Sequence, residues 1–144
     1  MTVRRILKHK SAEGIVTVPP STSVADAATV LAEKRIGTVV VSPDGKRFEG
    51  ILSERDIVRA VAREGAACLG RAVDELMTRR VETCEPDERA DRVLERMTEG
   101  RFRHMPVLEN GEMVALVSIG DVVKMRLDEV RAERDALEDM VMGR

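Results

Sequence analysis

The chain carries the same short polar motif twice, a serine followed three residues later by an aspartate. The copies are Ser53-Glu54-Arg55-Asp56 and Ser118-Ile119-Gly120-Asp121, each where an apolar run gives way to a helical pattern. Such a pair can cap a helix, with serine at the N-cap and the acid beside the positive end of the helix dipole. It can also bind a ligand, because helix N–H groups attract phosphate, the hydroxyl adds a hydrogen bond and a carboxylate accepts two hydrogen bonds from a ribose diol.

The two motifs belong to an internal repeat. Residues 15–20 return as 81–86, residues 50–58 return as 115–123, and the prefix 3–7 returns as 73–77. Each copy has the order short helix, strand, helix, two strands and helix. In a chain of 144 residues, this repeat predicts two half-domains that share one core rather than two independent domains.

The long helix of each copy is expected from its apolar spacing. Behind the hydroxyl residues 21–23, the segment 24–32 has an i, i+3, i+4, i+7, i+8 stripe, and the helix should end near Gly37. The segment 90–97 has the matching stripe, and Gly100 is expected to close that helix.

Two strands joined by a turn follow in each copy. The expected strands are 38–41 and 50–52 around the turn 43–45, then 104–108 and 115–117 around the turn 109–111, with 65–70 as the linker between copies.

This order of elements, with two Ser-x-x-Asp helix starts in tandem, resembles the CBS domain, named for cystathionine β-synthase. The resemblance covers residues 1 to about 126, and the whole is similar to a stand-alone bacterial CBS-pair protein. It implies an α/β (α+β) fold in which two CBS domains, 1–68 and 69–126, form a pseudo-twofold Bateman module before a helical extension, 127–144. Members of this family bind AMP, ADP, ATP, NAD or S-adenosylmethionine in two clefts.

The resemblance also implies roles for individual residues. Asp56 and Asp121 match the acids that hold ribose hydroxyls, and Ser53 and Ser118 match hydroxyls near the phosphates. The remaining matched positions are Thr17 and Thr83 on the first strands, the strand starts Ile36-Gly37-Thr38 and Arg103-His104-Met105-Pro106, and Arg55, Ile119 and Gly120 at the helix starts.

The two sites should differ chemically, because three matched pairs diverge. These pairs are Arg55 with Gly120, Gly37 with Arg103, and Gly50 with Ala115. His104 has two interpretations, an imidazole that a backbone carbonyl satisfies, or a contact with a ligand phosphate or ribose.

The composition excludes several function classes. The net charge of −2, the absence of Trp and Tyr and the two Phe residues argue against nucleic-acid binding. The apolar runs fall far short of the roughly 20 residues of a membrane span, so we expect a cytoplasmic protein without membrane contact. Cys68, Cys84 and the two histidines fit no metal spacing, which favours reduced structural thiols and no metal. No Ser-His-acid set recurs, and we expect no enzyme and no catalytic cofactor.

The C-terminal tail has a heptad pattern. Its positions are Val123, Leu127, Val130, Arg134, Leu137 and Val141. This spacing favours a long helix, from about 122 to 142, that contacts a second chain, with Arg134 helping to set the register. The alternative is a helix that packs back on its own module.

These features predict a regulatory sensor of an adenine nucleotide or NAD that acts as a homodimer and modulates an unidentified effector protein. The alternative is a structural adapter, in which the two motifs are only caps and the tail helix makes the contacts.

Overall fold

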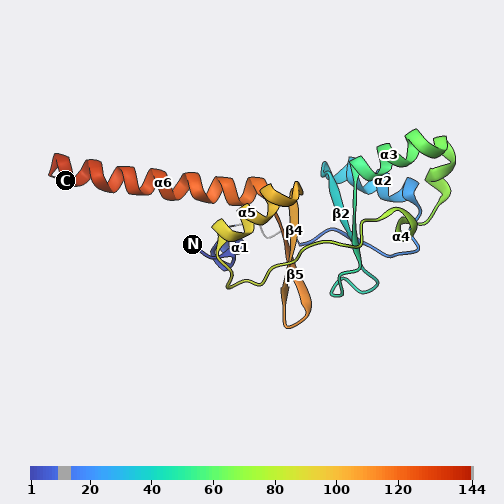
Figure 1. Cartoon of the computed structure of the whole chain (residues 1–144), viewed down its shortest axis with the longest axis horizontal. Coiled ribbons are helices and arrows are strands. Elements are labelled where there is room, and N and C mark those ends of the chain that lie inside the picture. The colour runs from blue at the N-terminus through green and yellow to red at the C-terminus, as the bar shows by residue number, and fades with distance from the viewer. Residues whose placement is uncertain (10–13, 144) are drawn as a thin grey trace. The chain divides into compact units, whose positions relative to one another are not determined.

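The computed structural model describes residues 1–9 and 14–143 (Figure 1). They form two compact units. Unit 1 contains the described residues within 1–12, 84–105 and 117–144, and unit 2 contains those within 13–83 and 106–116. The division does not follow the two sequence copies, because each unit draws elements from both.

Unit 2 is built on a three-stranded sheet. Strand β2 (Thr38–Val41) lies between β1 (Thr17–Val18), to which it is parallel, and β3 (Gly50–Ser53), to which it is antiparallel. The helices of this unit are α2 (Val24–Lys34), α3 (Glu54–Glu64), the 3₁₀ helix η1 (Gly65–Gly70) and α4 (Val73–Leu76). Their apolar faces form one core, made by Val18, Val24, Ala27, Leu31, Val39, Val41, Leu52, Val73 and Met77.

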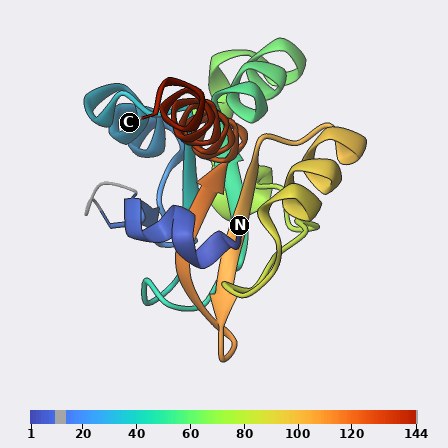
Figure 2. The same ribbon diagram turned by 90° about the vertical axis from the view of Figure 1, so that its left-hand side faces the viewer.

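Unit 1 consists mainly of helices, together with one end of each strand of a strand pair. Helices α1 (Val3–His9) and α5 (Ala90–Gly100) both pack against α6 (Ile119–Met142), which Figure 2 shows nearly end-on. Strands β4 (His104–Glu109) and β5 (Glu112–Ser118) pair with each other, and residues 106–116 of this pair belong to unit 2.

The short helix that opens the first sequence copy packs with elements of the second copy. In unit 1, the amide of Val3 donates to the carbonyl of Glu88 at 2.9 Å, and the amide of Ala90 donates to the carbonyl of Met1 at 3.1 Å. Because these bonds fix the start of α5 to the start of α1, the first copy supplies part of the framework of the second.

The reverse exchange occurs in unit 2, where α4 of the second copy packs with the first. The amide of Val73 donates to the carbonyl of Thr22, and the amide of Val24 donates to the carbonyl of Arg71, both at 2.8 Å. These four residues match the four of unit 1 in the repeat. The duplication is therefore visible in the hydrogen bonds as well as in the sequence.

Helices α2 and α5, which correspond in the two copies, both end on an arginine in the left-handed conformation. Arg35 after α2 has φ 54°, and Arg101 after α5 has φ 56°. The prediction that Gly100 closes α5 is therefore wrong by one residue, since Gly100 is still helical and Arg101 takes the cap position. An L-residue in this conformation costs about 1–2 kcal/mol, so local sequence preference did not reveal it.

The two copies differ in their first strand and in their turn. β1 (Thr17–Val18) corresponds to Thr83-Cys84 in the second copy, where Thr83 has no regular secondary structure and Cys84 forms an isolated β-bridge. The turn of the second copy matches the prediction, because Asn110 (φ 53°) and Gly111 (φ 79°) both have the positive φ that a type I′ hairpin needs.

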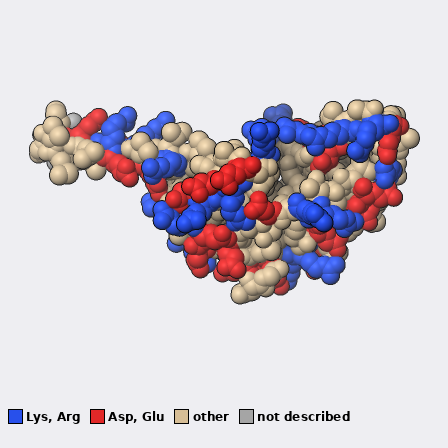
Figure 3. Space-filling model, viewed as in Figure 1, with Lys and Arg blue, Asp and Glu red and all other residues tan. Residues whose placement is uncertain are grey.

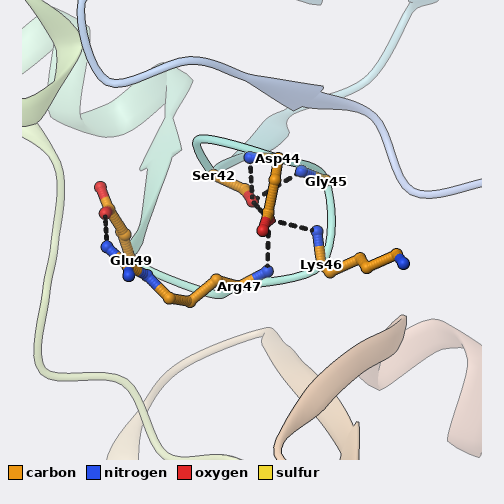
Figure 4. A network of polar contacts seen from close by, with 6 residues as sticks. All are labelled: Ser42, Asp44, Gly45, Lys46, Arg47 and Glu49. Carbon is orange, nitrogen blue, oxygen red and sulfur yellow. Dashed lines mark hydrogen bonds and ion pairs between the residues drawn. The ribbon is translucent and has the colours of Figure 1, made fainter.

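The first copy has a wider loop, which a network around Asp44 closes (Figure 4). Asp44 Oδ1 accepts hydrogen bonds from the amides of Lys46 and Arg47 at 2.8 Å each, and from the hydroxyl of Ser42 at 3.3 Å. The amide of Arg47, and then that of Lys46, lowers the pKa of Asp44 from its ordinary value. The loop is thereby an ordered turn.

Candidate functional site

The first Ser-x-x-Asp motif is a capping box at the start of α3. The amide of Asp56 donates to Ser53 Oγ at 3.1 Å, and the amide of Ser53 donates to Asp56 Oδ2 at 2.9 Å. These reciprocal bonds satisfy two backbone donors at the helix end, so the capping interpretation is confirmed here. Among residues 1–9 and 14–143, the other carboxylate oxygen, Oδ1, receives one long contact of 3.5 Å, from the hydroxyl of Thr78.

The second motif repeats this geometry at the start of α6. The amide of Asp121 donates to Ser118 Oγ at 3.1 Å, and the amide of Ser118 donates to Asp121 Oδ2 at 2.9 Å. Both aspartates therefore hold one oxygen against a backbone amide. Capping and ligand binding do not exclude each other, because a carboxylate has about four acceptor positions in total.

In unit 2, the predicted binding residues gather around the start of α3. Thr38 pairs with Ser53 across β2 and β3. The carbonyl of Gly37 accepts a hydrogen bond of 2.9 Å from the amide of Glu54, the first residue of α3. Thr17 lies in β1, on the opposite side of β2 from β3. The strand start 36–38 is thus beside the start of α3.

Unit 1 shows the same arrangement at the start of α6. The carbonyl of Arg103 accepts a hydrogen bond of 2.9 Å from the amide of Ile119. Arg103 is exposed and His104, the first residue of β4, is half-buried. The structure therefore brings Arg103, Ile119 and the capping box together, with a side chain at position 103 where the first copy has only Gly37.

Two predicted residues are core side chains. Met105 has no exposed surface and Pro106 is buried, so these positions offer a ligand their backbone groups rather than their side chains. Pro106 and Thr83 belong to unit 2, whereas Ser118 and Asp121 belong to unit 1.

One face of α3 is basic along its length. Arg55, Arg59 and Arg63 recur every four residues on one face of the helix, and all three are exposed. Within residues 1–9 and 14–143, none of the three forms a salt bridge. Figure 3 shows basic side chains gathered along α3. Like charges at this spacing destabilise a helix, and the row gives this face of α3 a positive charge beside the acidic Glu54 and Asp56 of its first turn.

Gly50 differs from its counterpart Ala115 because of packing. A Cβ atom at Gly50 would lie 2.6 Å from Met77 Sδ and 3.0 Å from the carbonyl oxygen of Thr78. The close approach is fixed by Ile51, which exchanges backbone hydrogen bonds of 3.0 and 2.8 Å with Thr78. This difference between the copies therefore reflects the fit of β3 against the segment after α4.

Sequence reasoning missed Thr78, whose hydroxyl approaches Asp56. Nothing in the local pattern marks this threonine, because it lies 22 positions from Asp56 and reaches it only through the exchange of α4 between the copies. The sequence contains an indirect indication of this contact, because residues 3–7 return as 73–77 just before Thr78.

Both cysteines are free and buried, as expected for structural thiols. Burial, and then the charge of Glu88, raises the pKa of Cys84 from 9.0 to about 12. The unfolded chain thus loses this proton near pH 9 while the folded chain keeps it. We expect the free energy of unfolding to fall as pH rises from 9 towards 12, with a slope approaching about 1.4 kcal/mol per pH unit.

Urea unfolding at several pH values between 8 and 11.5 measures this effect. Cys84→Ala is the matched control, since it removes the titrating group and should fall less steeply. Wild type and Cys84→Ala curves that run parallel over this range would contradict the burial of an ionisable thiol at this position.

Two kinds of feature are absent from the described residues. Neither 1–9 nor 14–143 contains a helix long and apolar enough to cross a membrane. In the same residues, no group of three or more His, Cys, Asp or Glu side chains is arranged to hold a metal ion.

Comparison with known proteins supplies the family. The CBS domain profile matches residues 3–63 and 73–128. The mitochondrial CBS domain-containing protein CBSX3 of Arabidopsis thaliana is 32% identical over 141 residues, covering 94% of this chain and 68% of that protein. CBSCBSPB3 of the same plant is 31% identical over 95% of this chain, which spans only 23% of that protein.

Solved structures agree with this match. The CBS-domain protein ATU1752 from Agrobacterium tumefaciens is 44% identical, with a TM-score of 0.81 over 88% of this chain and 99% of that one. PAE2072 from Pyrobaculum aerophilum, a CBS domain protein complexed with AMP, is 27% identical, with a TM-score of 0.71 over 84% of this chain and 89% of that one. CBSX2 in complex with AMP is 25% identical, with a TM-score of 0.75 over 88% and 96%. The chain belongs to the CBS-domain family and carries two CBS domains in tandem, with an α+β fold.

Proposed function

We propose that this chain is a regulatory module that binds an adenine nucleotide or NAD at the starts of α3 and α6. The observation that carries the proposal is the duplicated helix start, in which the same capping box and the same strand-start carbonyl recur in both copies. The AMP complexes of two relatives, PAE2072 and CBSX2, support an adenine ligand.

The chemistry of the first helix start suits such a ligand. Asp56 Oδ1 has capacity to accept hydrogen bonds from ribose hydroxyls, because the Thr78 hydroxyl, 3.5 Å away, is its one contact within the described part of the chain. The exposed Arg55 adds a positive charge at the N-terminal start of α3, where the helix dipole already favours a phosphate. The second start has Gly120 in place of Arg55 and Arg103 in place of Gly37, so we propose that the two sites differ in phosphate preference.

The chain would act as a homodimer. Each protomer would contribute two CBS domains, 1–68 and 69–126, and the extension 127–144. Ligand binding would bias an effector protein through differential affinity for two states of the module. The proposed role is one of regulation rather than catalysis.

Ligand uptake tests the proposal directly. Because the chain has no Trp or Tyr, bound adenine should dominate the absorbance near 260 nm of the purified protein. Added AMP, ATP or NAD should raise the melting temperature, and a ligand at 100 times its Kd stabilises the native state by about 2.7 kcal/mol. GMP is the control that carries a phosphate and a ribose without adenine. If no adenine compound at millimolar concentration shifts the melting temperature, the adapter function is favoured instead.

A further inference from the structure

The outer part of α6 has an apolar seam that its own unit does not cover. The exposed fractions along the seam are 43% for Val123, 49% for Leu127, 45% for Val130, 62% for Leu137 and 85% for Val141. In Figure 1, α6 extends far beyond α1 and α5, the helices on which its first turns pack. Between residues 126 and 143, no side chain is buried.

The seam faces away from the side of α6 that packs on unit 1. The residues buried at the base of α6 are Val122 and Met125. At 100° per residue, Val123 and Leu127 both lie about 160° around the helix from Met125. The first two positions of the seam therefore lie away from Met125, and their exposed fractions of 43% and 49% show that contacts within the chain leave them largely uncovered.

The spacing of the seam is that of a helix that pairs with another helix. Its six positions, with Arg134 as the one polar member, alternate steps of four and three residues from Val123 to Val141. Such a heptad repeat keeps one stripe facing a neighbouring helix over the roughly 27 Å that these residues span.

We propose that α6 pairs antiparallel with α6 of a second copy of this chain. The pairing rests on the homodimer of the proposed function and specifies which helix forms it and in which direction. One register matches all six positions. It places Leu127 against the partner's Leu137, Val130 against the partner's Arg134, and Val123 against the partner's Val141, each contact occurring twice by symmetry.

The charges beside the seam select this direction. A parallel pair in register would place Arg134 against the partner's Arg134 across the seam. It would also place Arg126 beside the partner's Arg131 and Glu133 beside the partner's Glu138, each twice, with no opposite charges in compensation.

The antiparallel pair removes most of this repulsion. Arg134 then faces an apolar residue, and its guanidinium keeps its own-chain contacts with Asp135 at 3.2 Å and Glu138 at 3.9 Å. Lys124 lies beside the partner's Glu138 at both ends of the seam. Like charges meet only at the centre of the seam. There Arg131 lies beside the partner's Arg131, and Glu133 lies beside the partner's Glu133.

Disulfide cross-linking in the full chain tests the register. Positions 127 and 137 of one helix are ten residues apart, about 15 Å, too far for a bond within the chain. A Leu127→Cys, Leu137→Cys protein should form a covalent dimer on mild oxidation, with the bond mapped between positions 127 and 137. Neither single variant should cross-link, because the same position on the partner helix lies about 15 Å away. Wild type, with buried Cys68 and Cys84, is the control.

Charge variants provide a second readout by analytical ultracentrifugation. Glu138→Lys should raise the dimer dissociation constant roughly three- to tenfold, since two Lys–Glu contacts become repulsive. Lys124→Glu should do the same, and the two changes together should restore wild-type affinity. A parallel pair predicts the opposite for Glu138→Lys, because the introduced lysine would then face the partner's Glu133 and tighten the dimer.

Cross-linking of either single variant, a tighter dimer with Glu138→Lys, or no covalent dimer from the double-cysteine protein would each overturn the antiparallel pairing. The melting shift with AMP, measured on the same proteins, separates the two proposals. A retained AMP shift without the predicted cross-link rejects only the pairing. Absence of a melting shift with AMP, ATP and NAD in wild type rejects nucleotide sensing whatever the cross-linking shows.

Discussion

Asp56→Ala should weaken binding of the adenine ligand at the first helix start by about tenfold or more and should also lower the melting temperature without ligand. The affinity falls because the variant loses hydrogen bonds to a charged carboxylate, each contributing about 1.5–3 kcal/mol. The stability falls because the amide of Ser53 loses its acceptor at 2.9 Å, and loss of such a cap costs about 1 kcal/mol. Calorimetric titration and thermal unfolding measure the two effects separately.

Asp56→Asn separates the cap from the ligand. Its amide oxygen can still accept from the Ser53 amide, so most of the stability should remain, while loss of the charge should still reduce affinity. Asp121→Ala should act in the same way at the second start. If all three variants bind AMP as wild type does once folded, the aspartates are only caps.

Gly50→Ala should lower the free energy of unfolding by about 1–3 kcal/mol, the usual cost of adding a methyl group to a filled space. The added Cβ would meet Met77 Sδ at 2.6 Å and Met77 Cγ at 2.9 Å. The thioether can move, but the carbonyl of Thr78 at 3.0 Å is held by hydrogen bonds to Ile51.

Gly70→Ala is the matched control for this substitution, because nothing lies within 4 Å of its Cβ position. Urea unfolding of the two variants gives the comparison. Equal stability of Gly50→Ala and Gly70→Ala would mean that β3 has room to move away from the segment after α4.

The features that the sequence predicted well are those with local causes. The two capping boxes depend on residues three positions apart, and the hairpin at Asn110-Gly111 depends on two adjacent residues that tolerate positive φ. The long helices follow from apolar spacing that lies within a single element. In each case the physical determinant is contained in a few consecutive residues.

The features that the sequence did not predict depend on distant contacts or on strain. Thr78 reaches Asp56 only because α4 packs in the unit of the other copy. Arg101 takes the left-handed cap although Gly100 precedes it, which local preference would not select. The second copy matches the first through residues 81–84, yet Cys84 forms an isolated β-bridge where the first copy has the strand β1, so sequence similarity between the copies did not ensure the same secondary structure.

The exchange of α1 and α4 between the copies also bears on how the chain acquires its structure during synthesis. The first helix leaves the ribosome early, but its partners follow much later, since Arg4 and its ion-pair partner Asp87 are separated by 83 positions. A gene fragment that encodes one copy would lack the helix that completes it, while retaining a helix whose binding surface is missing. Contacts at such separation require closure of a long loop before they contribute stability, which slows folding. The tandem pair, rather than the single repeat, is therefore the smallest piece of this chain that contains all the contacts of either unit.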